Sequence, residues 1–163
     1  MRRSRFGLLG LMLSLFAGHS QAEPAPGIPI AIAEFSYLDT SGEATDQEAA
    51  HQARLQAFMA ALQRDFDADR RFRPVPLSCG TCSAADDLAQ AASAAGAKIL
   101  VVGGIHKLST LVEWAKVQAI DISGDRVLAD RLFTFRGDND EAWVRAEAFL
   151  SDELRTALGE AGR

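Results

Sequence analysis

Three hydrophobic runs separated by two turn signals occupy the C-terminal half of the chain. Residues 97–106 are almost continuously apolar, whereas residues 111–122 alternate between apolar and polar side chains. A tight turn at residues 123–125 leads into a third run, residues 127–136. Runs of this length, period and spacing predict a three-stranded antiparallel meander, with its first strand in the centre of a sheet.

Two strand–helix units precede this meander. Residues 28–35 form a near-continuous apolar run, as expected of a strand that is buried on both faces. Apolar side chains then recur at helical spacing, which predicts a helix from about residue 46 to residue 66. A short strand over residues 72–77 contains Pro74 and Pro76, and their missing N–H groups place it at a sheet edge.

The remaining elements are two helices and a pair of glycines. An alanine-rich helix begins at Ser83, and the last helix begins after Asn139 or Asp140 as its N-cap. Gly103 and Gly104 predict a bulge or a close backbone approach in the central strand. The order is therefore β-α-β-α-β-β-β-α. It predicts an α/β (α+β) fold, a single domain with a mixed five-stranded sheet and helices packed on it.

The N-terminus has the pattern of a secretion signal. A basic segment precedes an apolar one that is too short to span a bilayer, and a small-x-small site ends at Ala22. We expect a cleaved signal peptide over residues 1–22, a disordered leader over 23–27 and one domain over 28–163. Cleavage removes three arginines from a chain whose formal net charge is −5. The mature protein is therefore expected in the periplasm, or secreted, with neither nucleic acid nor membrane as a partner.

The connections predict which loops share an edge of the sheet. Strands joined through a helix run parallel, and each hairpin reverses direction, so four strand ends meet at one carboxyl edge. Ligands usually bind at this edge in open α/β sheets. The candidate binding residues there are Asp39, Thr40, Ser41, Lys107, Ser109, Arg136 and Asp140, with Trp143 supporting them.

Solvated loops would produce the same polar residues, so a binding site is one of two interpretations. The sequence is also consistent with two different roles for Arg136. With Asp138 and Asp140 it would form a local ion-pair network that fixes the turn into the last helix. With Lys107 it would instead form an anion site.

Cys79 and Cys82 are the only cysteines, and export would place them in an oxidising compartment. We expect a structural disulfide, with a redox site at the start of the alanine-rich helix as the alternative. The two histidines of the mature chain, His51 and His106, show no metal-binding spacing. The sequence therefore predicts no metal and no cofactor.

Several short motifs resemble a family of secreted bacterial proteins catalogued as domain of unknown function 3280, also labelled 2380. The shared residues are Glu34-Phe35, Asp39-Thr40-Ser41, Cys79 with Cys82, Gly96-Ala97, residues 106–111, Asp121 with Gly124 and Val127, and residues 136–143. Thr110, Asp138-Asn139 and Ala142 depart from the family pattern. More distantly, the order of elements resembles small α/β domains such as the N-terminal domain of TolB and the curli-secretion lipoprotein.

The resemblance implies an exported domain without an assigned activity. We therefore expect a non-enzymatic accessory or binding module that contacts an envelope or periplasmic protein, or a small ligand, through the carboxyl edge. One alternative is a thiol–disulfide redox protein that uses Cys79 and Cys82. Another is a hydrolase that uses Asp39 and Asp140, which requires a raised pKa for one of these carboxyls.

Overall fold

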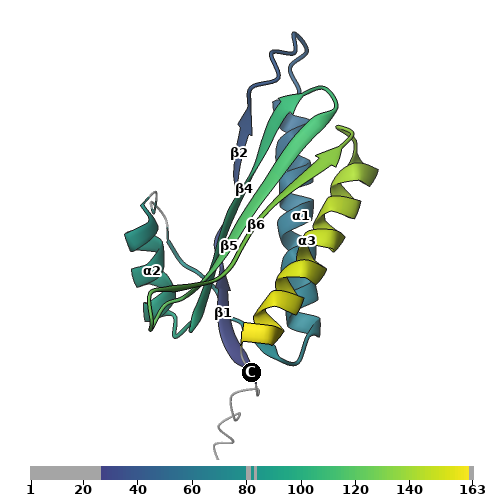
Figure 1. Ribbon diagram of the computed structural model, residues 1–163. Helices are drawn as coiled ribbons and strands as arrows, with labels where there is room; N and C mark the ends of the chain where they lie inside the picture. The colour runs from purple at the N-terminus through teal and green to yellow at the C-terminus, as the bar shows by residue number, and fades with distance from the viewer. Residues whose placement is uncertain (1–26, 80–81, 83, 162–163) are drawn as a thin grey trace, which may run out of the picture.

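The computed structural model describes residues 27–79, 82 and 84–161, and shows a mixed α/β domain with one open sheet (Figure 1). The strands lie in the order β3-β1-β4-β5-β6, with β2 paired to β4 beyond the end of β1. Their bounds are β1 Ile28–Ile32, β2 Ser36–Asp39, β3 Phe72–Pro74, β4 Ile99–Ser109, β5 Val112–Asp121 and β6 Arg126–Arg136. The predicted fold class is confirmed. The predicted signal peptide lies outside the described residues.

The first apolar run forms two strands rather than one. Both β1 and β2 pair in parallel with β4, which is eleven residues long and therefore has room for both. The chain crosses from one to the other at Phe35. A Cβ atom on Gly103 would lie 2.6 Å from the Phe35 ring, which confirms the predicted close backbone approach. Ser36–Asp39 extends the sheet as a sixth strand, where the sequence predicted five.

The proline-containing strand lies at the edge of the sheet, as predicted. β3 pairs in parallel with β1 alone among the described strands, and Pro74 is its last residue. β1 also pairs in parallel with β4, and β5 and β6 complete the antiparallel meander. The predicted strand directions are therefore confirmed.

Two long helices cover one face of the sheet, and a short helix covers part of the other (Figure 1). α1 spans Glu48–Ala68, and α3 spans Asp140–Ala161. Their apolar stripes bury the main core against the sheet, with side chains such as Phe58, Leu62, Leu150 and Leu154. α2, Ala85–Ala94, packs on the opposite face over the half of the sheet that contains β1.

The helix α3 begins directly after a capping residue. Asn139 is its N-cap, because the side-chain Oδ1 accepts a hydrogen bond from the N–H of Ala142 at 2.9 Å. This outcome confirms one of the two predicted caps. Within the described ranges, none of the helices combines the length and apolar character needed to cross a membrane.

Candidate functional site

Lys107 is the centre of a buried group of charges at the carboxyl edge of the sheet. Its side chain is 0% exposed, and its Nζ donates to Glu43 Oε2 and to Asp138 Oδ2 at 2.5 Å each. Asp39 Oδ2 lies 3.9 Å from the same nitrogen. One ammonium group therefore ties the end of β4 to the loop before α1 and to the turn before α3.

Asp138 receives further cationic and polar partners from α1. Arg54 Nη1 donates to Asp138 Oδ1 at 2.5 Å, and His51 Nε2 lies 3.0 Å from both carboxylate oxygens. Arg54 Nε also donates to Asp140 Oδ1 at 2.8 Å. We call Glu43, His51, Arg54, Lys107, Glu113 and Asp138 the buried charge cluster. It joins β4, β5, α1 and the start of α3.

The two central charges stabilise each other. Burial alone would lower the pKa of Lys107, but its hydrogen bonds to Asp138 and Glu43 outweigh burial and raise that pKa. Burial likewise opposes ionisation of Asp138, yet hydrogen bonds from Lys107 and His51 keep its pKa below the usual value. Both groups are therefore charged at neutral pH, which is the condition for a buried ion pair to hold the fold.

Glu113 is the exception in this cluster. Its side chain is 0% exposed, and neither carboxylate oxygen accepts a hydrogen bond from any described residue. Burial, reinforced by the negative charge of Asp138, raises the pKa of Glu113 to about 7, although Lys107 and the nearby indole N–H of Trp143 act in the opposite direction. A carboxyl group in this position takes up a proton close to neutral pH.

Aromatic rings surround the cluster on the core side. The rings of Tyr37 and His51 have centroids 4.9 Å apart, and Trp143 lies within 6.0 to 6.4 Å of Tyr37, His51 and Phe58. Trp143 is itself buried. These rings keep solvent from the cluster, which strengthens its ion pairs and raises the cost of breaking one.

The cluster includes a spacing that suits a metal ion. One ligand atom from each of His51, Glu113 and Asp138 lies within 4.8 Å of the others. However, the Lys107 ammonium and the Arg54 guanidinium already occupy the Asp138 carboxylate. A divalent cation at this position would be repelled by both positive charges at short range. The chemistry of the site is therefore that of an internal ion pair.

The predicted edge residues separate into a buried group and an exposed group. Asp39 and Lys107 do come together, and Thr40 Oγ1 makes a hydrogen bond of 2.7 Å with His106 Nε2. The Ser41 N–H donates to Asp39 Oδ1 at 2.8 Å, so this carboxylate fixes its own turn. Lys107 is fully buried and its ammonium group is already paired with two carboxylates, so its contact with a ligand and the anion site around it stay predictions.

The remaining predicted residues lie around the cluster. Asp140 is paired with Arg54 and its side chain is 89% exposed, whereas Trp143 is buried in the core beside the cluster. Ser109 Oγ accepts a hydrogen bond from the N–H of Leu111 in the β4–β5 turn. Arg136 is exposed at the end of β6. The ion pairs predicted for Arg136 with Asp138 and Asp140 are made by Arg54 instead.

Cys79 and Cys82 lie away from the buried charge cluster. A disulfide joins Cys79 to Cys82, as predicted, and its structural and redox interpretations both stay predictions. Both cysteines line a hollow with Met59 and Leu88, beside the middle of α1. They do not reach the end of β4, because β3 has only three residues.

The opposite face of the sheet carries an exposed apolar surface at the same edge. The register places Leu38, His106, Trp114 and Thr134 side by side across β2, β4, β5 and β6. The neighbouring row contains Lys116 and Leu132. In the described part of the chain, α2 covers only the other half of this face (Figure 1). We call these six residues the open face.

The fold and the site define a small α/β domain in which a buried charge cluster shapes one edge of a mixed sheet. The family model DUF3280, described as "Protein of unknown function (DUF2380)", matches residues 29–154. The chain belongs to this family, which confirms the resemblance found in its motifs.

Solved structures with the same fold have low sequence identity to this chain. TolB from Acinetobacter baumannii is similar over 82% of the chain, with a TM-score of 0.55 and 20% identity, and the chain spans 29% of TolB. Protein XCC0632 from Xanthomonas campestris, of family DUF330, has a TM-score of 0.55 and 11% identity, over 87% of this chain and 91% of that one. These likenesses show the fold alone.

The PelC dodecamer from Paraburkholderia phytofirmans is a third such structure. It has a TM-score of 0.52 and 13% identity, over 83% of this chain and 91% of PelC. No protein with curated functional information matches the chain.

Proposed function

We propose that the protein is a non-enzymatic periplasmic accessory module that binds an envelope protein through the carboxyl edge of its sheet and the adjoining open face. The secretion pattern over residues 1–22 supports export, and residues 28–163 would form the binding domain. The observation that carries the proposal is the exposed apolar surface beside the rigid edge.

The open face has the composition of a protein contact surface. Trp114 is 38% exposed, and Leu38 and Leu132 are 54% and 57% exposed. The Trp114 ring packs edge-on against His106, with centroids 6.0 Å apart, and so is held in one orientation. Tryptophan is enriched among the residues that contribute most to protein–protein binding, and a preoriented ring loses little entropy on binding.

Charge indicates what kind of partner surface fits. At the edge next to the open face, the carboxylate of Asp39 and the guanidinium of Arg136 are exposed, whereas the exposed carboxylates of Asp140 and Glu141 are paired with Arg54 and Arg145. The nearby Lys107 cation is buried and already neutralised. A partner with an apolar patch, bordered by a basic side chain opposite Asp39 and an acidic one opposite Arg136, would therefore complement this surface.

The carboxyl groups give no support to a hydrolase at the rim. The Ser41 hydrogen bonds and the Lys107 charge outweigh partial burial of Asp39 and lower its pKa, whereas a general acid needs a raised one. Among the residues that the structure describes, the carboxyls with raised pKa values are Glu113 and Glu147, and both are buried.

Replacing Trp114 with Ala should remove the main anchor of the partner. We expect capture of the partner from an envelope extract to fall by about tenfold or more. The melting temperature should change little, because the side chain is partly exposed and lies outside the main core. Quantitative mass spectrometry of proteins retained by the immobilised wild-type and variant proteins measures the effect.

Val127→Ser is the matched control. Val127 is 53% exposed and lies beside the β5–β6 turn, at the opposite end of the strands. This variant should retain the partner at the wild-type level. Equal retention by the Trp114 and Val127 variants would contradict the proposal.

A further inference from the structure

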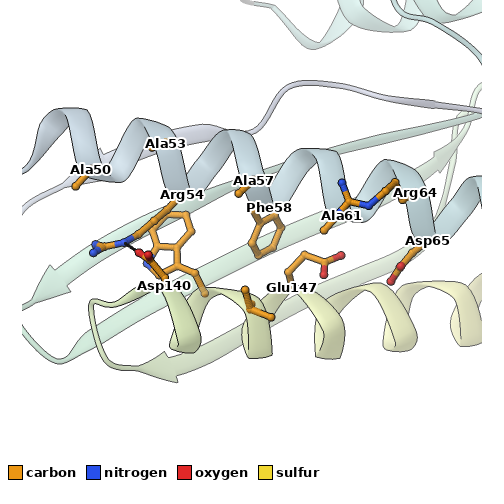
Figure 2. A pocket seen from close by; sticks show the side chains of 12 residues that line it. Ala50, Ala53, Arg54, Ala57, Phe58, Ala61, Arg64, Asp65, Asp140 and Glu147 are labelled. Carbon is orange, nitrogen blue, oxygen red and sulfur yellow. Dashed lines mark hydrogen bonds and ion pairs between the residues drawn. The ribbon is translucent and has the colours of Figure 1, made fainter.

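A groove runs between α1 and α3 on the side of these helices that faces away from the sheet (Figure 2). Its volume is about 750 Å³, within the range of small-molecule sites. The α1 wall consists of Ala50, Ala53, Ala57 and Ala61, whose spacing places them on one stripe of the helix. Because these side chains are small, they leave the space between the helices open.

Glu147 on α3 lines this groove and is only 5% exposed. Its carboxyl group points toward α1, close to Phe58 and Ala61 (Figure 2). The Oε1 atom is buried and has no hydrogen-bond partner within the described part of the chain. An acceptor left unpaired in an apolar groove costs stability, and a ligand that donates to it recovers that cost.

The surrounding charges favour a cation beside Glu147. Asp65 on α1 lines the same end of the groove and raises the pKa of Glu147 further, after burial, to about 7. Arg64 and Arg155 act in the opposite direction. Arg64 lines the same end of the groove, although its side chain is exposed to solvent (Figure 2). Arg155 lies 3.8 Å from Asp69 and 3.7 Å from Asp152. The positive charge of Arg155 is thus largely compensated.

At the other end of the groove lie Arg54 and Asp140, which form an ion pair. Arg54 is bound to Asp140 and to Asp138, so it has no free charge to offer an anion. Between the two ends, the floor contains Phe58 and Trp143. The groove is therefore apolar along its length, with an excess of acceptor groups at one end.

We propose that this groove binds a small amphiphilic amine, an apolar chain that ends in an ammonium group. The chain would lie along the alanine stripe, over Phe58 and Trp143. The ammonium group would donate hydrogen bonds to Glu147 Oε1 and to the carboxylate of Asp65. No covalent step is involved, and a protonated Glu147 would release its proton to solvent as the cation binds. The site is separate from the open face, and the proposal does not depend on the proposed function.

Trp143 provides a direct probe, because it lines the groove. In a Trp114→Phe background it is the sole tryptophan, since the chain contains two. We expect n-octylamine, below its micellar concentration, to change the Trp143 fluorescence saturably. The isosteric n-octanol should bind more weakly, and n-octanoate more weakly still, because its carboxylate would face Glu147 and Asp65.

Two variants test the role assigned to each part of the groove. Glu147→Gln keeps the shape but removes the charge, and should weaken n-octylamine binding by about tenfold or more. Ala57→Leu should block all three probes, since Ala57 is exposed and the added atoms fill the groove. Arg64→Gln should leave amine binding unchanged or tighter. In the wild type, amine affinity should rise between pH 5.5 and pH 8, and this rise should vanish in Glu147→Gln.

Three results would overturn the proposal. One is equal binding of amine, alcohol and carboxylate with no effect of Glu147→Gln, which would indicate a non-specific apolar surface. Another is preferential binding of n-octanoate that is lost in Arg64→Gln, which would indicate an anion site. The third is no saturable change with any probe. Circular dichroism of each variant verifies that the fold is intact.

Discussion

Replacing Lys107 with Met should lower the free energy of unfolding by about 3–5 kcal/mol at neutral pH. Met preserves most of the apolar stem but removes the ammonium group. Asp138 and Glu43 would then lose the cation that each contacts at 2.5 Å, in a site with no solvent access to Lys107. Urea unfolding followed by circular dichroism measures the loss.

The matched control is Lys116→Met. Lys116 is a half-exposed lysine that pairs with Asp130 on the surface, and surface pairs contribute at most about 1 kcal/mol. The double variant Lys107→Met with Asp138→Asn should recover part of the lost stability, because it also removes a buried carboxylate that has lost one of its two cations. Equal effects of the two lysine substitutions would show that the cluster does not hold the edge of the sheet together.

Replacing Glu113 with Gln should stabilise the protein at pH 8 by about 3 kcal/mol and have little effect below about pH 4.5. The folded-state pKa of Glu113 is about 7, above that of the unfolded chain. The native state therefore binds more protons between these values, and the wild-type protein loses stability as pH rises through this range. Gln cannot ionise, so the variant avoids this loss.

Urea unfolding at a series of pH values tests this prediction. Glu141→Gln is the control, because Glu141 is exposed at the start of α3 and makes only a surface ion pair with Arg145. That variant should follow the wild-type pH profile. If Glu113→Gln instead destabilised the protein at pH 8, ionised Glu113 would have to be a bonded member of the cluster.

Much of the fold could be predicted from local patterns. The alternation of apolar and polar residues predicted the meander. The missing N–H groups of Pro74 and Pro76 predicted that β3 lies at the edge of the sheet. The break between β1 and β2 could not be predicted in this way, because the apolar run continues through Ala33 and Phe35 without a turn signal. The break depends on a distant glycine, Gly103, which leaves space for Phe35 to cross.

The site was predicted less completely. Connection direction correctly brought Asp39, Lys107 and Asp140 to one edge, but it could not show which of them is buried. Which of these side chains is buried depends on His51 and Arg54, which contact Asp138 across more than eighty residues of sequence. No local pattern records such a contact.

Glu113 and Trp114 were not predicted as site residues, although the alternation of apolar and polar residues in β5 indicated both. Glu113 falls on the same side of the strand as the buried Ala115 and Val117, so a carboxyl group among core positions was visible in the sequence. Trp114 falls on the polar side, beside Lys116. A charged residue on the apolar side and an aromatic one on the polar side both break the pattern, and such breaks often occur at functional or strained sites.

The central claim is that the open face, supported by the buried charge cluster, contacts an envelope protein. Photocrosslinking in living cells, with a photoreactive amino acid in place of Trp114 or of Val127, tests it most directly. The account predicts a defined adduct with an envelope protein from position 114 and none from position 127. Adducts from position 127 alone, or from neither position, would contradict it.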